Sequence, residues 1–197
     1  MGLDIFFEKR KRDYDFSSRN NLINKQGEID NQISELLKGN PRPNTILGIA
    51  SLISDGEIET AKKTYDLSDV ELAEKLAPLQ RERNELHDEI IASDPRTEIA
   101  YFRKVNFLMT YFGYEGNCEY KLIEKAEVEE LIDRCKKVLD NHELAGELLP
   151  TASGFFFGST NYDDWYFLDV ENVRMTFERM LKNVDWETEA VEMYCWW

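Results

Sequence analysis

The sequence predicts an α+β protein, with a small antiparallel sheet, helices packed on that sheet and an inserted antiparallel helical hairpin. The first observation behind this expectation is the placement of the 24 aromatic residues. Four lie in residues 1–16, 19 lie in residues 101–197, and Tyr65 alone lies in residues 17–98. Because aromatic side chains dominate the energetics of a core, we expect a core domain of residues 1–16 and 99–197, with residues 17–98 inserted into it.

The second observation is a helical pattern within residues 17–98. Apolar residues recur at spacings of three and four, which is typical of two helices that meet along a coiled-coil-like seam. One polar residue, Gln26 or Arg83, lies in the register of each helix. Such an arm either packs along the core or projects to bind a partner, including a second copy of this chain as a homodimer. The seam comprises Leu22, Ile29, Ile33 and Leu36, then Leu72, Leu76, Leu79, Leu86 and Ile90.

The boundaries of the second helix of the arm are set by local signals. Ser68 and Glu71 have the spacing of a capping box, so we expect the helix to begin beside them. Pro78 then predicts a kink or a later start, because proline lacks a backbone N–H. The stretch "KGNPRPNTILGIASLISDGE" between the two helices predicts a turn, a short apolar piece and another turn.

The third observation is the mixture of strand and helix patterns in the core domain. Strands are expected in "LDIFFEKRKRDY", "CEYKLIEK" and "DWETEAVEMYCWW". Helices are expected from Thr97 to about Tyr111, over the apolar stripe from Val128 to Leu139, in "NHELAGELLP" and in "NYDDWYFLDVENVRMTFERMLKNV". The strands at the two ends of the chain are expected to pair, which gives the α+β class.

The stretch Gly154–Gly158, "GFFFG", predicts a buried strand that leads into a polar loop. In an extended run Phe155 and Phe157 would share one face and Phe156 the other. Replacing Phe156 by alanine would cost about 3–5 kcal/mol if its ring is buried. The stretch is no nucleotide loop, because it has no lysine before its Ser-Thr pair and lacks the G-x-G-x-x-G spacing.

The net charge of −15 and the pI of about 4.6 disfavour binding to nucleic acid, whose phosphates would repel the chain. A DNA mimic is disfavoured as well, because the net charge is spread as −6 over residues 17–98 and −9 over residues 99–197. The three cysteines form no C-x-x-C motif, and no apolar run reaches the length of a membrane span. We therefore expect a cytoplasmic protein with no membrane partner.

Catalytic and metal sites find little support in the sequence. The histidines, His87 and His142, are far apart, and there is no G-x-S-x-G elbow for a nucleophilic serine. Asp163, Asp164 and Asp169 fall near the start of one predicted helix, where acidic residues ordinarily complement the helix dipole. No catalytic residue, metal or cofactor is predicted, which favours a role other than enzyme.

A ligand site is predicted around the loop that follows the phenylalanines. Ser159, Thr160 or Asn161 is expected to cap the next helix, whose N-terminus offers free N–H groups. Asp163 and Asp164 would oppose an anion there, so a self-capped helix is the favoured interpretation. A nucleotide-like ligand would otherwise bind between aromatic walls and a few polar groups. The candidate ligand-binding residues are Arg103, Lys104, Asn106, Thr151, Ser159, Thr160 and Tyr162.

Several stretches resemble a family of uncharacterised phage and prophage proteins. They are "MGLDIFF" at the start, "YFRKVN" at 101–106, "ELAGELLPTASGFFFGSTNYDDWYFLD" at 143–169 and, more loosely, the tail "EMYCWW". The resemblance covers residues 1–8 and about 99–197, and leaves residues 17–98 without a counterpart. It implies a mobile-element origin, a compact core domain and a host bacterial cell as the location, but no reaction.

Two functions follow as hypotheses. The first is an accessory protein that holds a host protein, through the helical arm or the acidic surface. The alternative is a protein that binds or sequesters a small nucleotide-like ligand in a pocket near Phe155–Phe157. Host protein or small ligand is therefore the expected partner.

Overall fold

The computed structural model describes residues 2–197, which divide into two compact units. The core unit comprises the described residues up to Tyr14 together with Pro95–Trp197, and the insertion comprises Asp15–Asp94. Each unit has a hydrophobic cluster of its own. The insertion ends before residue 97, because Thr97 is the first residue of strand β2 in the sheet of the core unit.

The sheet of the core unit confirms the predicted α+β class. Its strands are β1 (Asp4–Lys11), β2 (Thr97–Arg103), β3 (Tyr120–Ile123) and β4 (Glu189–Trp196), in the order β2-β1-β4-β3 with every neighbouring pair antiparallel. The two central strands come from opposite ends of the chain, with Ile5 opposite Cys195 and Phe7 opposite Met193. This pairing explains why the aromatic residues gather at both ends of the sequence.

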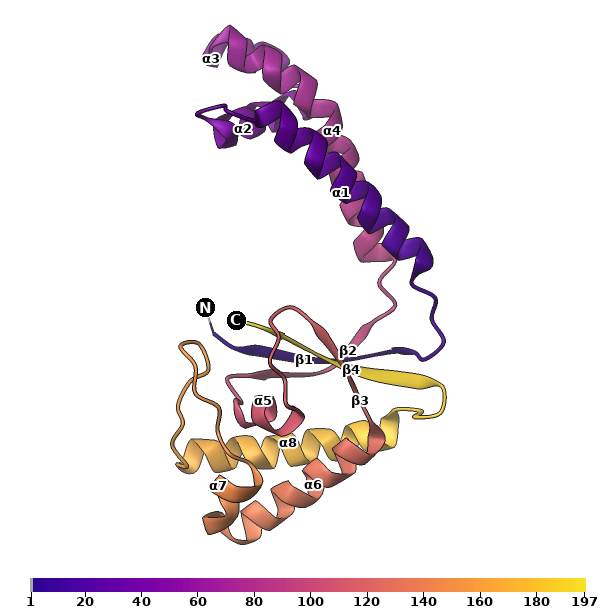
Figure 1. Cartoon of the computed structure of the whole chain (residues 1–197), viewed down its shortest axis with the longest axis vertical. Coiled ribbons are helices and arrows are strands. Elements are labelled where there is room, and N and C mark those ends of the chain that lie inside the picture. The colour runs from indigo at the N-terminus through magenta and orange to yellow at the C-terminus, as the bar shows by residue number, and fades with distance from the viewer. Residues whose placement is uncertain (1) are drawn as a thin grey trace. The chain divides into compact units, whose positions relative to one another are not determined.

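The helices of the core unit cover one face of the sheet (Figure 1). They are α5 (Phe107–Phe112), α6 (Lys125–Asp140), the 3-10 turn η1 (His142–Leu144), α7 (Ala145–Leu148) and α8 (Asp164–Asn183). Under them, the ring of Phe7 lies 4.9 Å from that of Phe177 and 5.6 Å from that of Phe112, measured between centroids. All three side chains are fully buried and form the centre of the core.

The insertion consists of α1 (Ser17–Leu37), α2 (Pro43–Ser54), α3 (Ile58–Thr64) and α4 (Leu67–Ala92). Its core includes Ile33 from α1, Ile46 from α2 and Leu76 from α4. The polar positions of the seam meet, since the Gln26 side chain donates to the Arg83 carbonyl at 3.5 Å. The apolar piece between the arms is a helix that packs into the same core, so the arm is a small bundle rather than a bare hairpin.

Two expected helix starts are wrong. Residues 97–103 form strand β2 instead of a helix, because Ala100 and Phe102 alternate into the core opposite Phe7 and Ile5. The helix that follows is short and begins at Phe107. In the insertion, α4 begins at Leu67, so Ser68 and Glu71 lie inside it and form no capping box. Pro78 lies within α4 and does not delay its start.

Candidate functional site

The stretch Gly154–Gly158 forms a turn, and the predicted strand is wrong. The Phe157 N–H donates to the Gly154 carbonyl at 3.1 Å, which closes the turn on itself. The Phe156 carbonyl accepts a hydrogen bond from the Leu3 N–H at 2.9 Å, which fastens the turn to the residue before β1. Gly158 has a φ of 91°, a conformation that favours glycine and takes the chain out of the turn.

The three phenylalanine rings have different environments. Phe155 is 96% exposed, although it lies on a turn with fixed backbone contacts. The ring of Phe156 is half-buried and meets that of Phe155 edge-on, with centroids 4.9 Å apart. Phe157 packs against the core of the unit, and its ring centroid lies 5.3 Å from that of Trp197. A Cβ atom at Gly154 would come within 2.8 Å of the Phe157 ring, so this position has no room for a side chain.

Asn106 holds the loop that carries these residues. Its Nδ2 group donates to the carbonyls of Phe157 and Ser159 at 3.2 and 2.8 Å, and its Oδ1 atom accepts from the Ala152 N–H at 3.3 Å. The side chain is 3% exposed. All of its hydrogen bonds go to backbone groups of residues 152–159, so Asn106 positions the loop rather than a ligand.

A pocket of about 240 Å³ lies between this loop and the start of α8. One wall is the stem of Lys104, which packs against Gly158; a Cβ atom there would be 3.2 Å from the Lys104 Cβ. Lys104 itself has a φ of 60°, in the left-handed region. Trp165 also lines the pocket and is 76% exposed. The other lining residues are Val105, Asn106, Phe107, Ser159, Asn161, Asp163, Tyr166 and Asp169.

The structure brings three of the seven candidate ligand-binding residues to this pocket: Lys104, Asn106 and Ser159. The other four lie elsewhere. Arg103 is on β2 opposite Asp4, and Tyr162 packs its ring on Tyr166 at 4.9 Å. The Thr151 hydroxyl donates to the Thr160 carbonyl at 3.2 Å, which ties the two ends of the loop together. Trp165 lies outside the predicted set, although a tryptophan in the first turn of a helix beside a polar loop is a usable signal.

The N-terminus of α8 is capped by Asp163, whose carboxylate accepts from the Tyr166 N–H at 3.1 Å. The expected cap at Ser159, Thr160 or Asn161 is therefore wrong. Ser159 instead accepts from the Asn161 N–H at 3.1 Å within the loop. Burial and, to a smaller degree, the nearby Asp163 raise the pKa of Asp169. Asp163 and Asp169 share the lining of the pocket with the cationic Lys104.

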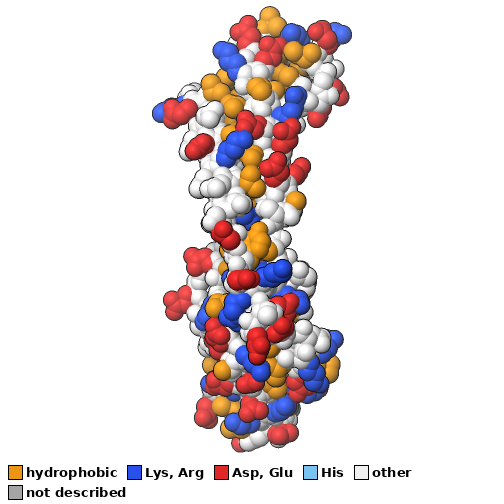
Figure 2. Space-filling view, turned by 90° about the vertical axis from the view of Figure 1, so that its right-hand side faces the viewer, with side chains coloured by type: hydrophobic (Ala, Val, Ile, Leu, Met, Phe, Trp, Pro, Cys, Tyr) orange, Lys and Arg blue, Asp and Glu red, His pale blue; other side chains and the backbone are white. Residues whose placement is uncertain are grey.

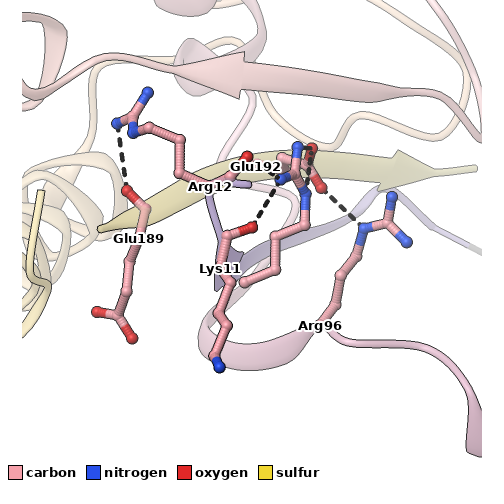
Figure 3. Close-up of polar contacts among 6 residues, drawn as sticks. Lys11, Arg12, Arg96, Glu189 and Glu192 are labelled. Carbon is pink, nitrogen blue, oxygen red and sulfur yellow. Dashed lines mark hydrogen bonds and ion pairs between the residues drawn. The ribbon is translucent and has the colours of Figure 1, made fainter. Parts of the chain in front are cut away.

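A second polar cluster lies on the sheet, around Glu192 (Figure 3). Its carboxylate receives Arg10 at 2.6 Å and Arg96 at 2.8 Å, and all three side chains are largely buried. The Arg96 guanidinium also lies over the Tyr120 ring, 3.8 Å from its centroid. Because the Glu192 carboxylate forms ion pairs with both arginines and all three side chains are largely buried, we interpret the cluster as a structural ion network.

Two of the three cysteines, Cys135 and Cys195, are buried. Burial raises the pKa of the Cys135 and Cys195 thiols to about 12, so neither is a thiolate at neutral pH. Cys118 is exposed, and its Sγ atom lies 3.6 Å from Asn117 Oδ1. Among residues 2–197, no three His, Cys, Asp or Glu side chains are grouped so that they could hold a metal ion.

Comparison with protein-family models, curated proteins and solved structures finds no significant match to this chain. Within residues 2–197, no helix combines the length and the apolar character that crossing a membrane requires. The candidate site is therefore defined by its own geometry: an exposed Phe155 on an anchored turn, with a pocket and an exposed tryptophan beside it.

Proposed function

We propose that this protein is a phage- or prophage-type accessory factor that acts by binding a host protein, with Phe155 as an anchor residue. The observation that carries the proposal is the 96% exposure of a phenylalanine on a turn whose backbone is held from both sides. The resemblance of residues 143–169 to phage and prophage proteins supports the cellular setting.

The energetic argument concerns the solvent-exposed ring. Full burial of a phenylalanine side chain is worth about 1.5–3 kcal/mol, and this chain leaves that gain unused at Phe155. The hydrogen bonds from Leu3 and Asn106 fix the turn before any partner arrives. A preorganised anchor loses less conformational entropy on binding, and aromatic anchors in partner pockets are typical hot spots of protein interfaces.

The test is capture of partners from a bacterial lysate on the immobilised protein. We expect wild type to retain a protein that Phe155→Ser loses. The matched control is Leu122→Ser, which removes another exposed apolar side chain, from β3 on the sheet. Identical sets of captured proteins with wild type and Phe155→Ser would overturn the role of the anchor.

The pocket beside the loop supports a second candidate, the binding of a small nucleotide-like ligand. Its volume of about 240 Å³ and the exposed Trp165 suit a planar ring stacked on the indole. A thermal-shift panel of nucleosides and nucleotides tests this candidate, because a ligand that binds the native state raises Tm. Trp165→Ala should abolish any shift, and the absence of a shift at millimolar ligand would contradict the candidate.

A further inference from the structure

The segment of residues 138–173 contains no lysine or arginine, yet it has seven acidic residues. It includes α7, the loop with Phe155 and the first half of α8. Since residues 99–197 have a net charge of −9, this segment accounts for most of the negative charge of that part of the chain. The acidic residues are Asp140, Glu143, Glu147, Asp163, Asp164, Asp169 and Glu171.

Within the described chain, most of these acids form no ion pair, although Lys104 lines the same pocket as Asp163 and Asp169. Among the ion pairs found in residues 2–197, Glu171 with Arg174 is the one that involves the segment. Elsewhere acids are compensated, as in Glu192 with its two arginines and Glu82 with Lys25. On the face shown in Figure 2, acidic and basic side chains are interspersed. Residues 138–173 therefore carry an excess of negative charge that ion pairs among residues 2–197 leave largely uncompensated.

Exposed apolar side chains lie in the same segment. Phe155, Tyr162, Trp165 and Leu168 are all exposed, the last two on the first turns of α8. Figure 1 shows α7, the loop and the start of α8 together at one end of the core unit. We call this region, formed by the exposed residues of 138–173, the acidic-aromatic surface.

We propose that the acidic-aromatic surface binds a protein whose docking face is basic, with lysine or arginine side chains around an apolar cleft for Phe155. This inference rests on the proposed function and specifies the kind of partner. A basic face matches the unpaired carboxylates, and an apolar cleft matches the exposed ring. Nucleic acid and anionic membranes carry the wrong charge for this surface, and no three metal-ligating side chains are grouped in residues 2–197.

The charges and the ring have separate roles. Uncompensated surface charges steer an oppositely charged partner and raise its association rate, and this contribution is screened by salt. The ring is buried only in the final complex and slows dissociation. The two contributions can therefore be removed independently by substitution.

The first arm of the test uses a defined cationic probe. A fluorescein-labelled peptide of alternating arginines and leucines is titrated with wild type, and a counterpart with glutamate in place of arginine serves as the charge control. The surface variant Glu143→Gln/Glu147→Gln/Asp164→Asn removes three exposed charges. The matched variant Glu28→Gln/Asp88→Asn/Glu89→Gln removes three exposed charges from the insertion.

We expect the surface variant to weaken binding of the cationic peptide about tenfold at low salt, since each exposed pair contributes modestly. The insertion variant, with the same net charge, should bind within about twofold of wild type. Equal weakening by the two variants would show that only net charge matters and would overturn the inference.

The second arm repeats the lysate capture with the same variants. The species lost with Phe155→Ser should also be lost with the surface variant, kept with the insertion variant, and released by raising salt to about 0.3 M. Retention of that species by the surface variant would overturn the inference. If Phe155→Ser loses nothing, the proposed function fails, and the peptide arm still decides whether this surface selects cations.

Discussion

The Asn106 side chain donates a hydrogen bond to the Ser159 carbonyl at 2.8 Å, across 53 residues of sequence. Together with its bonds to Phe157 and Ala152, it joins the start of α5 to the loop before α8. The loop has no strand partner of its own, so this buried amide replaces a sheet ladder.

Asn106→Ala should lower the free energy of unfolding by about 2–3 kcal/mol, because it removes three part-buried hydrogen bonds made by a buried amide. Urea denaturation followed by tryptophan fluorescence measures this change. Asn161→Ala, at an exposed position of the same loop, should stay within about 0.5 kcal/mol of wild type. A loss below about 0.5 kcal/mol for Asn106→Ala would show that the loop is held by other contacts.

The three phenylalanines should differ in their contribution to stability. Phe155→Ala should change the free energy of unfolding by less than about 0.5 kcal/mol, because the ring is exposed in the native state. Phe157→Ala should cost about 1.5–3 kcal/mol, less than a full core truncation because the ring is only partly buried against Trp197.

Phe156 is half-buried, so the loss of stability in Phe156→Ala should lie between those of Phe155→Ala and Phe157→Ala. It should stay below the range expected for a buried ring. Chemical denaturation of the three alanine variants in parallel gives the order. Equal losses at Phe155 and Phe157 would contradict the arrangement of the turn.

Sequence patterns predict correctly those elements in which buried apolar residues recur at a regular spacing along one segment. The stripe of α6 is confirmed, with Val128, Leu131 and Cys135 buried. The strands at the two ends followed from the aromatic distribution and from the pairing that a shared core requires. The fold class could therefore be predicted, because periodicity and composition report burial directly.

The failures lie where distant contacts decide the local structure. Residues 97–103 satisfy a helical spacing as well as an alternating one, and their pairing with β1 selects the strand. The turn at Gly154–Gly158 is set by Leu3 and Asn106, which are remote in sequence. Asn106 belongs to the predicted ligand-binding set, but its side chain holds the loop instead. Local sequence patterns carry no information about its hydrogen bond to Ser159, which lies 53 residues further along the chain.

The stability of the fold should depend on pH through Glu192. Burial raises its pKa, but hydrogen bonds from Arg10 and Arg96 outweigh burial and hold the pKa below its ordinary 4.5. A carboxylate whose pKa is depressed in the folded state stabilises the fold fully at pH values above its pKa in the unfolded state. The contribution is lost as pH falls through the folded value.

Glu192→Gln should therefore lower the free energy of unfolding by about 3 kcal/mol or more at pH 7, since it removes the carboxylate charge with which two largely buried arginines form ion pairs. The difference in free energy of unfolding between variant and wild type should shrink as the pH falls below 4.5, the ordinary pKa of glutamate. Urea denaturation at a series of pH values measures it. A difference that stays constant down to about pH 3 would mean that the charge of Glu192 is not what stabilises the sheet.

The two units should be separable in unfolding experiments, because each has its own hydrophobic cluster. All four tryptophans, Trp165, Trp186, Trp196 and Trp197, belong to the core unit. Tryptophan fluorescence therefore reports the core unit, whereas far-UV circular dichroism includes the four helices of the insertion. The two signals can distinguish where a substitution acts.

Ile46→Ala truncates a fully buried side chain of α2 and should destabilise the insertion by about 2–4 kcal/mol. We expect the circular dichroism transition to move to lower urea while the fluorescence transition stays in place. Phe177→Leu, in the core of the other unit, is the reciprocal variant and should move the fluorescence transition. Coincident shifts of both signals with Ile46→Ala would show that the chain unfolds as one cooperative unit, because two independent cores would give two transitions.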